Sequence, residues 1–195
     1  MNDIDKICEL AAQGDSIAQF NLGLCYYYGD GVPQDYEHAF TWFQRAADQG
    51  HVTTQYNVGV FYDKGFLGTQ DYEKATYWYR KAAEQGNPNA QFNLANCYAS
   101  GLGVSQSYEE AINWHLKSAE QGEPLAQYLL GYLHKNGLGC QVDYERARYW
   151  YIMAYYNASD PDLRKLAMQK AEDLSHTNSI TMTTIDDAPK MLEHI

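Results

Sequence analysis

One stretch of sequence decides the fold of this chain, and it reads Asp71-Tyr72-Glu73-Lys74-Ala75-Thr76-Tyr77-Trp78-Tyr79-Arg80-Lys81-Ala82-Ala83-Glu84-Gln85-Gly86. The pattern returns 36 residues earlier, from Asp35 to Gly50, and 36 residues later, from Ser107 to Gly122. A fourth copy begins at Asp143. All four tryptophans of the chain occupy one position of this repeat, as Trp42, Trp78, Trp114 and Trp150. A fixed period of about 20–50 residues is typical of stacked repeats, each of which buries its apolar face against its neighbours.

Each copy contains two predicted helices. The first runs over about Ser16–Tyr28 in copy one, and its apolar stripe returns in the other copies. One position of that stripe is always small, as Gly23, Gly59, Ala95 and Gly131. Because a mid-helix glycine costs about 1 kcal/mol relative to alanine, we expect the paired helix to approach closely there. A glycine follows each first helix and predicts a left-handed terminal residue, at Gly29, Gly65, Gly101 and Gly137.

The second helix of each copy follows a residue that can cap it, namely Asp35, Asp71, Ser107 or Asp143. Its Tyr, Ala, Trp and Ala positions form an apolar face at helical spacing. Copy two departs from the pattern in the turn between its helices, where Leu67 replaces a glycine and Gly68 replaces a valine. We expect a local rearrangement of that turn, and an unchanged register because its length is kept.

The chain is therefore predicted to be all-α, with four helix-turn-helix repeats of period 36 and a capping helix at each end. We place a capping helix in residues 1–14, repeats at 15–50, 51–86, 87–122 and 123–157, and a second capping helix in 158–175. Residues 176–195 have few apolar side chains and no clear period, so we expect a mobile tail, with a short helix over Ala188–Glu193 as its one candidate element.

Composition narrows the classes of partner. The 195 residues carry a formal net charge of −11, and an acidic surface repels phosphate backbones, which makes nucleic acid an improbable partner. Basic proteins are weakly favoured, although solubility alone accounts for such a charge at least as well. No apolar run approaches the ~20 residues of a membrane span. The segment Met1–Lys6 is acidic and predicts no signal peptide, so we expect a cytoplasmic protein, with secretion by another route left open.

Cysteine and histidine positions give no sign of a metal, cofactor or catalytic site. Cys25 and Cys97 are separated by a whole repeat, whereas a disulfide needs Cα atoms within about 7 Å, so we expect reduced thiols. No CxxC pair or zinc spacing is present, and no nucleophile motif, phosphate-binding loop or HExxH occurs. His134 replaces a tyrosine of the apolar stripe, which favours packing over catalysis. We therefore predict a protein that is not an enzyme and holds no cofactor or metal.

The consensus reads Ala-Gln-x-x-Leu-Gly-x-x-Tyr-x-x-Gly-x-Gly-Val, then Asp-Tyr-x-x-Ala-x-x-Trp-x-x-x-Ala-Ala-x-Gln-Gly. It closely resembles the Sel-one-like repeat (SLR), a relative of the tetratricopeptide repeat, and the resemblance covers residues 11–156. The departures are Thr54, Leu67, Ala95 and His134. The resemblance implies an α/α superhelical solenoid whose first helices line a concave groove, and it implies adaptors and scaffolds of protein complexes, abundant in bacteria. The cysteine pattern of the secreted, disulfide-rich branch is missing from this chain.

Candidate partner-binding residues are those on the first helices that lie outside the constant stripe. They share one helical face, and by the resemblance that face lines the groove. They are Ile17, Phe20, Leu24, Tyr27, Tyr28, Tyr56, Asp63, Phe92, Asn96, Tyr128, Tyr132 and Lys135. The position of Phe20, Tyr56, Phe92 and Tyr128 is aromatic in every copy, which favours packing between adjacent repeats. The variable positions are the stronger candidates for partner contact, because exposed aromatic residues are frequent interface anchors.

Two binding functions remain open. The first is a scaffold or adaptor that holds a protein or peptide in the groove. The second is an inhibitor or immunity protein that blocks a basic toxin or enzyme, which the net charge of −11 mildly favours. Self-association through the ends of the stack is also left open, so a homo-oligomer is not excluded.

Overall fold

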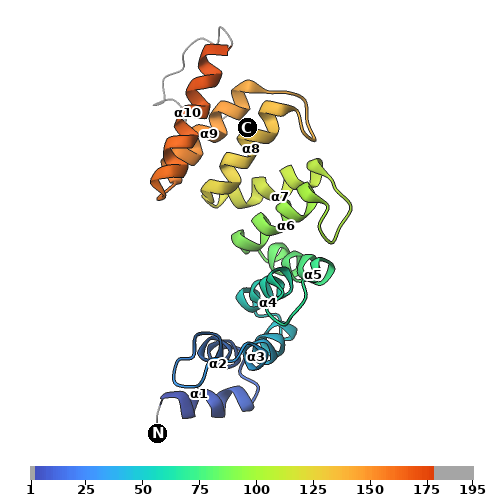
Figure 1. Cartoon of the computed structure of the whole chain (residues 1–195), viewed down its shortest axis with the longest axis vertical. Helices are drawn as coiled ribbons and strands as arrows, with labels where there is room; N and C mark the ends of the chain where they lie inside the picture. The colour runs from blue at the N-terminus through green and yellow to red at the C-terminus, as the bar shows by residue number, and fades with distance from the viewer. Residues whose placement is uncertain (1–2, 178–195) are drawn as a thin grey trace. The chain divides into compact units, whose positions relative to one another are not determined.

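Helices account for all the regular structure in residues 3–177, which are the residues that this computed structural model describes, and that part of the chain holds no strand (Figure 1). The helices are α1 (Asp3–Ala12), α2 (Ser16–Tyr28), α3 (Tyr36–Asp48), α4 (Val52–Lys64), α5 (Tyr72–Glu84), α6 (Pro88–Ser100), α7 (Tyr108–Glu120), α8 (Pro124–Asn136), α9 (Tyr144–Asn157) and α10 (Pro161–Thr177). The predicted all-α fold of four helix pairs with one further helix at each end is confirmed.

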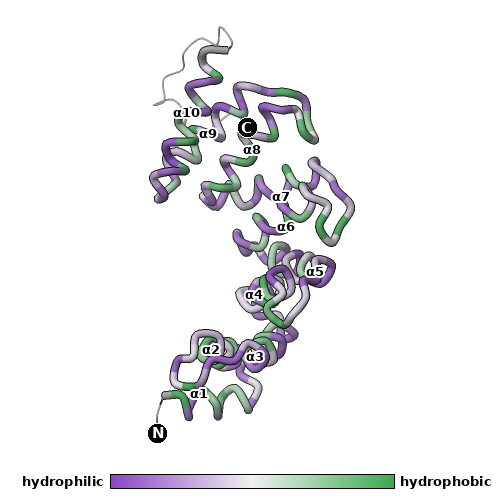
Figure 2. The backbone as a smooth tube through the Cα atoms, in the orientation of Figure 1, coloured by the Kyte–Doolittle hydropathy of each residue, from purple (hydrophilic) through white to green (hydrophobic). Residues whose placement is uncertain are grey.

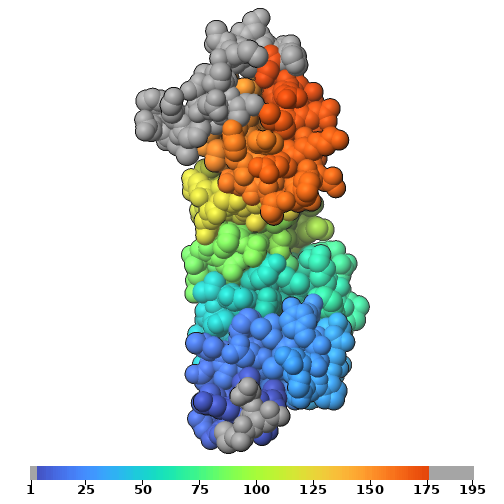
Figure 3. Space-filling view, turned by 90° about the vertical axis from the view of Figure 1, so that its left-hand side faces the viewer, coloured from blue at the N-terminus to red at the C-terminus, as the bar shows by residue number. Residues whose placement is uncertain are grey.

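Two compact units make up the described residues. The first holds residues 3–97 and 101–105, and the second holds 98–100 and 106–177. In the first unit α1 packs on α2, α2 on α3, α3 on α4, and α4 on α5. In the second unit α7 packs on α8, α8 on α9, and α9 on α10. Within each unit the surface therefore follows the order of the chain, helix by helix (Figure 3).

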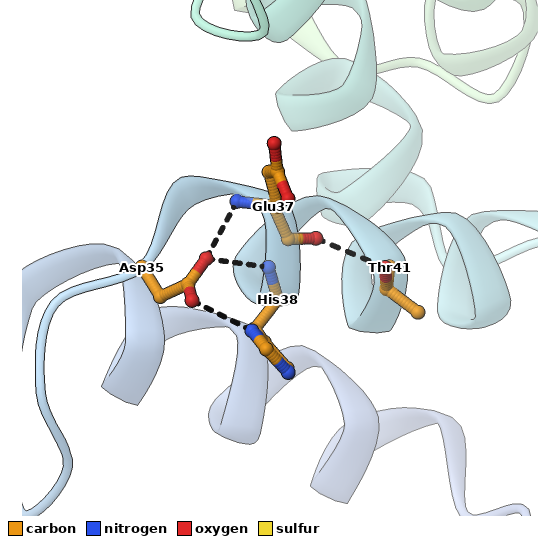
Figure 4. Close-up of polar contacts among 4 residues, drawn as sticks. All are labelled: Asp35, Glu37, His38 and Thr41. Atoms are coloured by element: carbon orange, nitrogen blue, oxygen red, sulfur yellow. Dashed lines mark hydrogen bonds and ion pairs between the residues drawn. The ribbon is translucent and has the colours of Figure 1, made fainter.

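Side-chain caps begin the second helices where the sequence predicts them. Asp35 Oδ1 accepts hydrogen bonds from the backbone N–H groups of Glu37 and His38, each at 2.9 Å (Figure 4). Asp71, Ser107 and Asp143 each accept one from the N–H three residues on. Such a cap satisfies an N–H that has no partner inside the helix and contributes roughly 1 kcal/mol. The glycines that follow the first helices have φ between 65° and 77°, as predicted.

Close approach explains the small residue of the stripe. A Cβ added to Gly23 would lie 2.5 Å from the ring of Phe43 on the paired helix. The equivalent distances are 2.6 Å from Gly59 to Tyr79 and 2.7 Å from Gly131 to Tyr151. Real Cβ atoms essentially never come this close to another heavy atom. In the third copy the two positions hold Ala95 and a smaller ring, His115.

Buried glutamines join successive helix pairs. Gln55 is 4% exposed, and its Nε2 donates to the carbonyl of Ala47 at the end of the preceding helix, at 3.2 Å. Its Oε1 accepts from Gln85 Nε2 at 2.7 Å. Gln19 makes the same pair of contacts in copy one, and Gln127 does so in copy four with an asparagine as its second partner. The carbonyl that each glutamine reaches also accepts from the N–H of the glycine three residues on, so the glutamine adds a second hydrogen bond to it and ties the end of one copy to the start of the next.

The end helices cover the apolar faces of the outermost pairs. Ile4 and Ile7 of α1 pack against Ala18 and Leu22 of α2, and the tube of α1 alternates between apolar and polar residues (Figure 2). On α10, Ala171 and Leu174 pack with Ile152 of α9. Helix α10 runs to Thr177, two residues into the predicted tail. The remainder of that tail, including the candidate helix over Ala188–Glu193, lies outside the described residues.

The unusual turn of copy two is rearranged as predicted. In the other copies the second turn glycine is left-handed, with φ of 73° at Gly31, 69° at Gly103 and 76° at Gly139. Leu67 occupies this position in copy two, and no residue other than glycine has a positive φ among the described residues. The left-handed conformation has moved one residue on, to Gly68, with φ of 116°. The turn thereby accommodates Leu67 and the preceding Phe66.

Candidate functional site

A pocket of about 130 Å³ lies between α2 and α4 in the first unit. Three of the predicted site residues line it, namely Leu24, Tyr27 and Tyr28 of α2. The rest of its wall was not among the predicted site residues and consists of Phe43 of α3, Asn57, Val60 and Phe61 of α4, and Phe66 of the turn after α4. The two first helices of copies one and two therefore contribute most of the lining.

Three of the aromatic rings that line this pocket contact one another. The ring centroid of Tyr27 lies 5.8 Å from that of Phe61 and 6.0 Å from that of Phe66, and the last two are 5.1 Å apart. Tyr36 adds a fourth ring, stacked on Phe66 at 5.3 Å and 5.4 Å from Tyr27. Aromatic pairs prefer centroid separations of about 4.5–7 Å, so each of these ring contacts is favourable. We call Tyr27, Tyr36, Phe61 and Phe66 the aromatic cluster.

Three members of the aromatic cluster depart from the repeat. The equivalents of Tyr27 in the other copies are Asp63, Ala99 and Lys135, and those of Phe61 are Cys25, Cys97 and Leu133. The equivalents of Phe66 are Asp30, Leu102 and Leu138. The repeat fold forms in the other copies without these rings, so the fold does not require them. This departure was visible in the aligned copies and could have identified Phe61 and Phe66 from the sequence.

Tyr28 stands at the pocket with most of its side chain in solvent. It is 71% exposed, and its ring meets that of Tyr27 edge-on, with centroids 4.9 Å apart and an interplanar angle of 89°. Burial, together with the neighbouring Tyr36 and Tyr28 hydroxyls, raises the pKa of Tyr27, so its ring stays neutral at physiological pH. An exposed tyrosine beside a pocket lined by aromatic rings can cover a bound side chain and bury much of its own ring against it.

The position that is aromatic in every copy is half-buried on each first helix, and we call its four residues, Phe20, Tyr56, Phe92 and Tyr128, the aromatic ladder. Phe20 contacts Phe43 at 6.1 Å, Tyr56 contacts Tyr79 at 6.0 Å, and Tyr128 contacts Tyr151 at 5.2 Å between ring centroids. Each partner lies on the second helix of the same copy, whereas the sequence favoured contacts between adjacent repeats. Phe20 also reaches the start of the next copy, with its ring 5.1 Å from that of His51. Phe92, the third member of the ladder, is half-buried on α6.

The other predicted site residues do not join the pocket. Ile17 is 61% exposed at the start of α2, and Asn96 is half-buried on α6. Asp63 lies one helical turn beyond Val60, with its carboxylate 3.2 Å from Lys64 Nζ. In the second unit, Tyr132 is 47% exposed on α8 and Lys135 is half-buried.

The described His, Cys, Asp and Glu side chains do not assemble a metal site. Those residues contain no group of three or more His, Cys, Asp or Glu side chains placed to hold a metal ion. The closest Cys–His contact joins Cys140 Sγ and His134 Nδ1 at 3.4 Å. Burial raises the pKa of Cys140 and lowers that of His134, so both groups are neutral, unlike an activated thiolate. None of the described helices is long and apolar enough to cross a membrane.

Solved structures similar to this chain are repeat proteins. A protective antigen of uropathogenic Escherichia coli with an SLR fold is 30% identical, with a TM-score of 0.77 over 89% of this chain and 41% of its own. A Sel1 repeat protein from Oxalobacter formigenes is 33% identical, with a TM-score of 0.74 over 85% of this chain and 53% of its own. The chain thus spans less than two thirds of either protein. The immunity protein Pa5087 from Pseudomonas aeruginosa is 20% identical, with a TM-score of 0.50 over 88% of this chain and 73% of its own, and shows a likeness of fold alone.

No curated protein sequence matches the chain. The model of the Sel1 repeat matches it four times in succession, over residues 16–51, 53–87, 88–123 and 124–159. These matches follow the helix pairs α2–α3, α4–α5, α6–α7 and α8–α9. The chain therefore belongs to the Sel1 repeat family, whose repeats mediate protein–protein interaction and are generally not catalytic.

Proposed function

We propose that this chain is a non-catalytic scaffold or adaptor that holds a segment of another protein against α2 and α4, with one of its side chains in the aromatic pocket. The observation that carries the proposal is the departure of Tyr27, Phe61 and Phe66 from the repeat at one place. Four rings meet there beside an open pocket, and Tyr28 adds a large exposed ring. Interfaces are enriched in such aromatic anchors, and a few of them supply most of the binding energy.

Photo-crosslinking from two tyrosines tests the proposal. A photoreactive phenylalanine analogue replaces Tyr28 in one variant and Tyr77 in the other, and both are irradiated in the cells from which the chain comes. Tyr77 is a matched control, because it is 53% exposed but belongs to α5, a second helix. We expect a discrete protein adduct from position 28 and none from position 77. Equal adducts from both positions, or none from position 28, would contradict the proposal.

The alternative is an inhibitor or immunity protein that blocks a basic toxin or enzyme, and the net charge of −11 is the observation that favours it. Attraction between exposed charges is screened over a Debye length of about 10 Å at 0.1 M salt. An inhibitor that depends on charge should therefore lose most of its affinity between about 0.05 and 0.5 M salt, on the order of tenfold or more. A partner that binds mainly through the aromatic pocket should be nearly insensitive to salt.

The cytoplasmic location expected from the amino-terminal sequence stays a prediction, as does the absence of nucleic acid among the partners. Fractionation of cells that express the chain from its own promoter checks the first. Sedimentation over a range of concentrations checks self-association, which the sequence left open.

A further inference from the structure

We propose, building on the proposed function, that Asn57 is the polar anchor of the aromatic pocket and binds a main-chain peptide group of the inserted segment. One copy further on, the hydroxyl of Tyr79 lies beside Asn93, the equivalent of Asn57. Phe43 stands at the position of Tyr79 and has no hydroxyl. Its place is taken by a pocket with a free amide in the wall.

Phe43 of α3 and Tyr79 of α5 occupy equivalent positions, and their rings are oriented alike. The ring centroid of Phe43 lies 6.1 Å from that of Phe20, at an interplanar angle of 35°. The ring centroid of Tyr79 lies 6.0 Å from that of Tyr56, at 33°. Each ring also presents its Cδ1 and Cε1 atoms to the glycine of the first-helix stripe. A hydroxyl added to the Phe43 ring would therefore take the position that the Tyr79 hydroxyl has one copy further on.

That position lies in the pocket. Burial raises the pKa of Tyr79, and the side chains that also act on its hydroxyl are those of Asp63, Tyr56, Cys97 and Asn93. Their equivalents one copy earlier are Tyr27, Phe20, Phe61 and Asn57. All of these but Phe20 line the pocket, together with Phe43. The pocket is therefore the space that a tyrosine hydroxyl fills in the next copy.

The amides of Asn57 and Asn93 differ in what they meet. The Asn93 side chain lies beside the Tyr79 hydroxyl, where it opposes the rise of the Tyr79 pKa that burial causes. Asn57 shares the pocket with the ring of Phe43, which offers no hydrogen bond. Its half-buried amide has no hydrogen-bond partner within residues 3–177. Asn57 is thus free to bind a group that enters from outside.

An occupant that covers this amide has to replace the hydrogen bonds that water makes to it. A polar group that is buried without a partner is penalised, so a purely apolar occupant would bind weakly. An asparagine amide has both donors and an acceptor, which match the acceptor and the donor of a peptide group. A segment that inserts a side chain beside Asn57 brings its own peptide groups to the same wall, and these also need partners when they are buried. A main-chain peptide group therefore satisfies both sides of the contact.

Short peptides of random sequence, displayed on phage and selected on the purified full chain, provide the probe. Synthetic copies of the selected peptides are measured by fluorescence anisotropy. Phe43→Tyr should weaken their binding at least about tenfold, because the new hydroxyl enters the pocket and takes up the Asn57 amide. Asn57→Leu, which introduces the residue that copy four carries at this position, should weaken it about fivefold or more.

Replacement of single peptide groups by esters identifies the group that Asn57 holds, because an ester lacks the N–H donor. We expect one ester position to weaken binding to the wild-type chain about fivefold or more, and to have no further effect on binding to Asn57→Leu. Such coupling shows that the two groups interact. A merely structural role of Asn57 would leave the two effects additive.

Asn93→Leu is the matched control, because it makes the same substitution where the amide lies beside a tyrosine hydroxyl. It should leave the affinity unchanged. Phe43→Tyr should fold, since copy two carries a tyrosine at the equivalent position against the same kind of glycine. Urea denaturation checks that this variant is no less stable than the wild type.

The outcomes separate this inference from the proposed function. Peptides that lose affinity with Tyr28→Ala but bind Phe43→Tyr and Asn57→Leu as tightly as the wild type overturn the inference and leave the proposed function standing. An ester scan in which no position is coupled to Asn57 does the same. Failure of the library to yield any peptide sensitive to Tyr28→Ala overturns both.

Discussion

Gly59→Ala is the substitution that most directly tests how the helix pairs fit together. The new Cβ would lie 2.6 Å and 2.7 Å from Cδ1 and Cε1 of Tyr79, and 3.3 Å from the carbonyl oxygen of Ala75. Tyr79 is 1% exposed, so its ring is enclosed by other groups of the protein. Overpacking of this kind costs typically about 1–3 kcal/mol, and we expect the upper end because two ring atoms and a backbone oxygen are close. The higher helix propensity of alanine offsets about 1 kcal/mol. The net loss of stability should be about 2 kcal/mol.

Urea denaturation followed by circular dichroism measures this loss as a lower midpoint at an unchanged slope. The repeat contains its own control, because copy three carries Ala95 and His115 at the two equivalent positions. The double variant Gly59→Ala with Tyr79→His should therefore lose less stability than the sum of the losses caused by the two single substitutions. The difference in the free energy of unfolding should be about 1 kcal/mol or more. A Gly59→Ala protein as stable as the wild type, or two strictly additive effects, would show that close approach is not why this position is small.

Three further predictions concern single side chains. Gln55→Leu should destabilise the protein by about 1–2 kcal/mol in the same urea assay, because the Ala47 carbonyl and the Gln85 amide each lose one of their hydrogen bonds and keep another; a loss below about 0.5 kcal/mol would refute this role. Asp71→Ala should cost about 1 kcal/mol through loss of the cap on α5, and Asp71→Ser, which introduces the capping residue of copy three, should restore most of it. Burial lowers the pKa of His115 to about 4 from an ordinary 6.5. As the pH falls, the unfolded chain therefore binds a proton at this histidine before the folded chain does. This contribution to stability is complete above about pH 6.5 and falls by up to about 3 kcal/mol towards pH 4, and His115→Gln should flatten the curve relative to wild type in that window. Parallel curves for the two proteins would contradict it.

Local contacts made much of the fold predictable. The cap at Asp35 involves N–H groups two and three residues away, and Gly29 ends α2 in the left-handed conformation. Such interactions depend only on neighbouring residues, so their signals are present in the sequence. The repeat itself supplied the rest, because a position that stays small in four copies, such as that of Gly59, must meet the same constraint in each.

The candidate site was only partly predictable. The sequence identified Leu24, Tyr27 and Tyr28 because they vary on the first-helix face, and the structure places all three at one pocket. It offered no reason to join them to Phe61 and Phe66, which lie more than 30 residues further along the chain. Phe61 stood in a position that holds cysteine or leucine elsewhere, and Phe66 stood in an irregular turn.

By itself, the sequence determined the period, the helix boundaries near their caps, and the membership of the Sel1 repeat family, because each depends on residue spacing that a linear chain displays. Only the tertiary structure decided which rings meet. The contact of Tyr27 with Phe66 depends on how α2 and α4 lie against one another and on the shift of the left-handed residue from position 67 to Gly68. Packing between helices distant in sequence is set by the summed fit of many side chains, and no spacing rule along the chain specifies it.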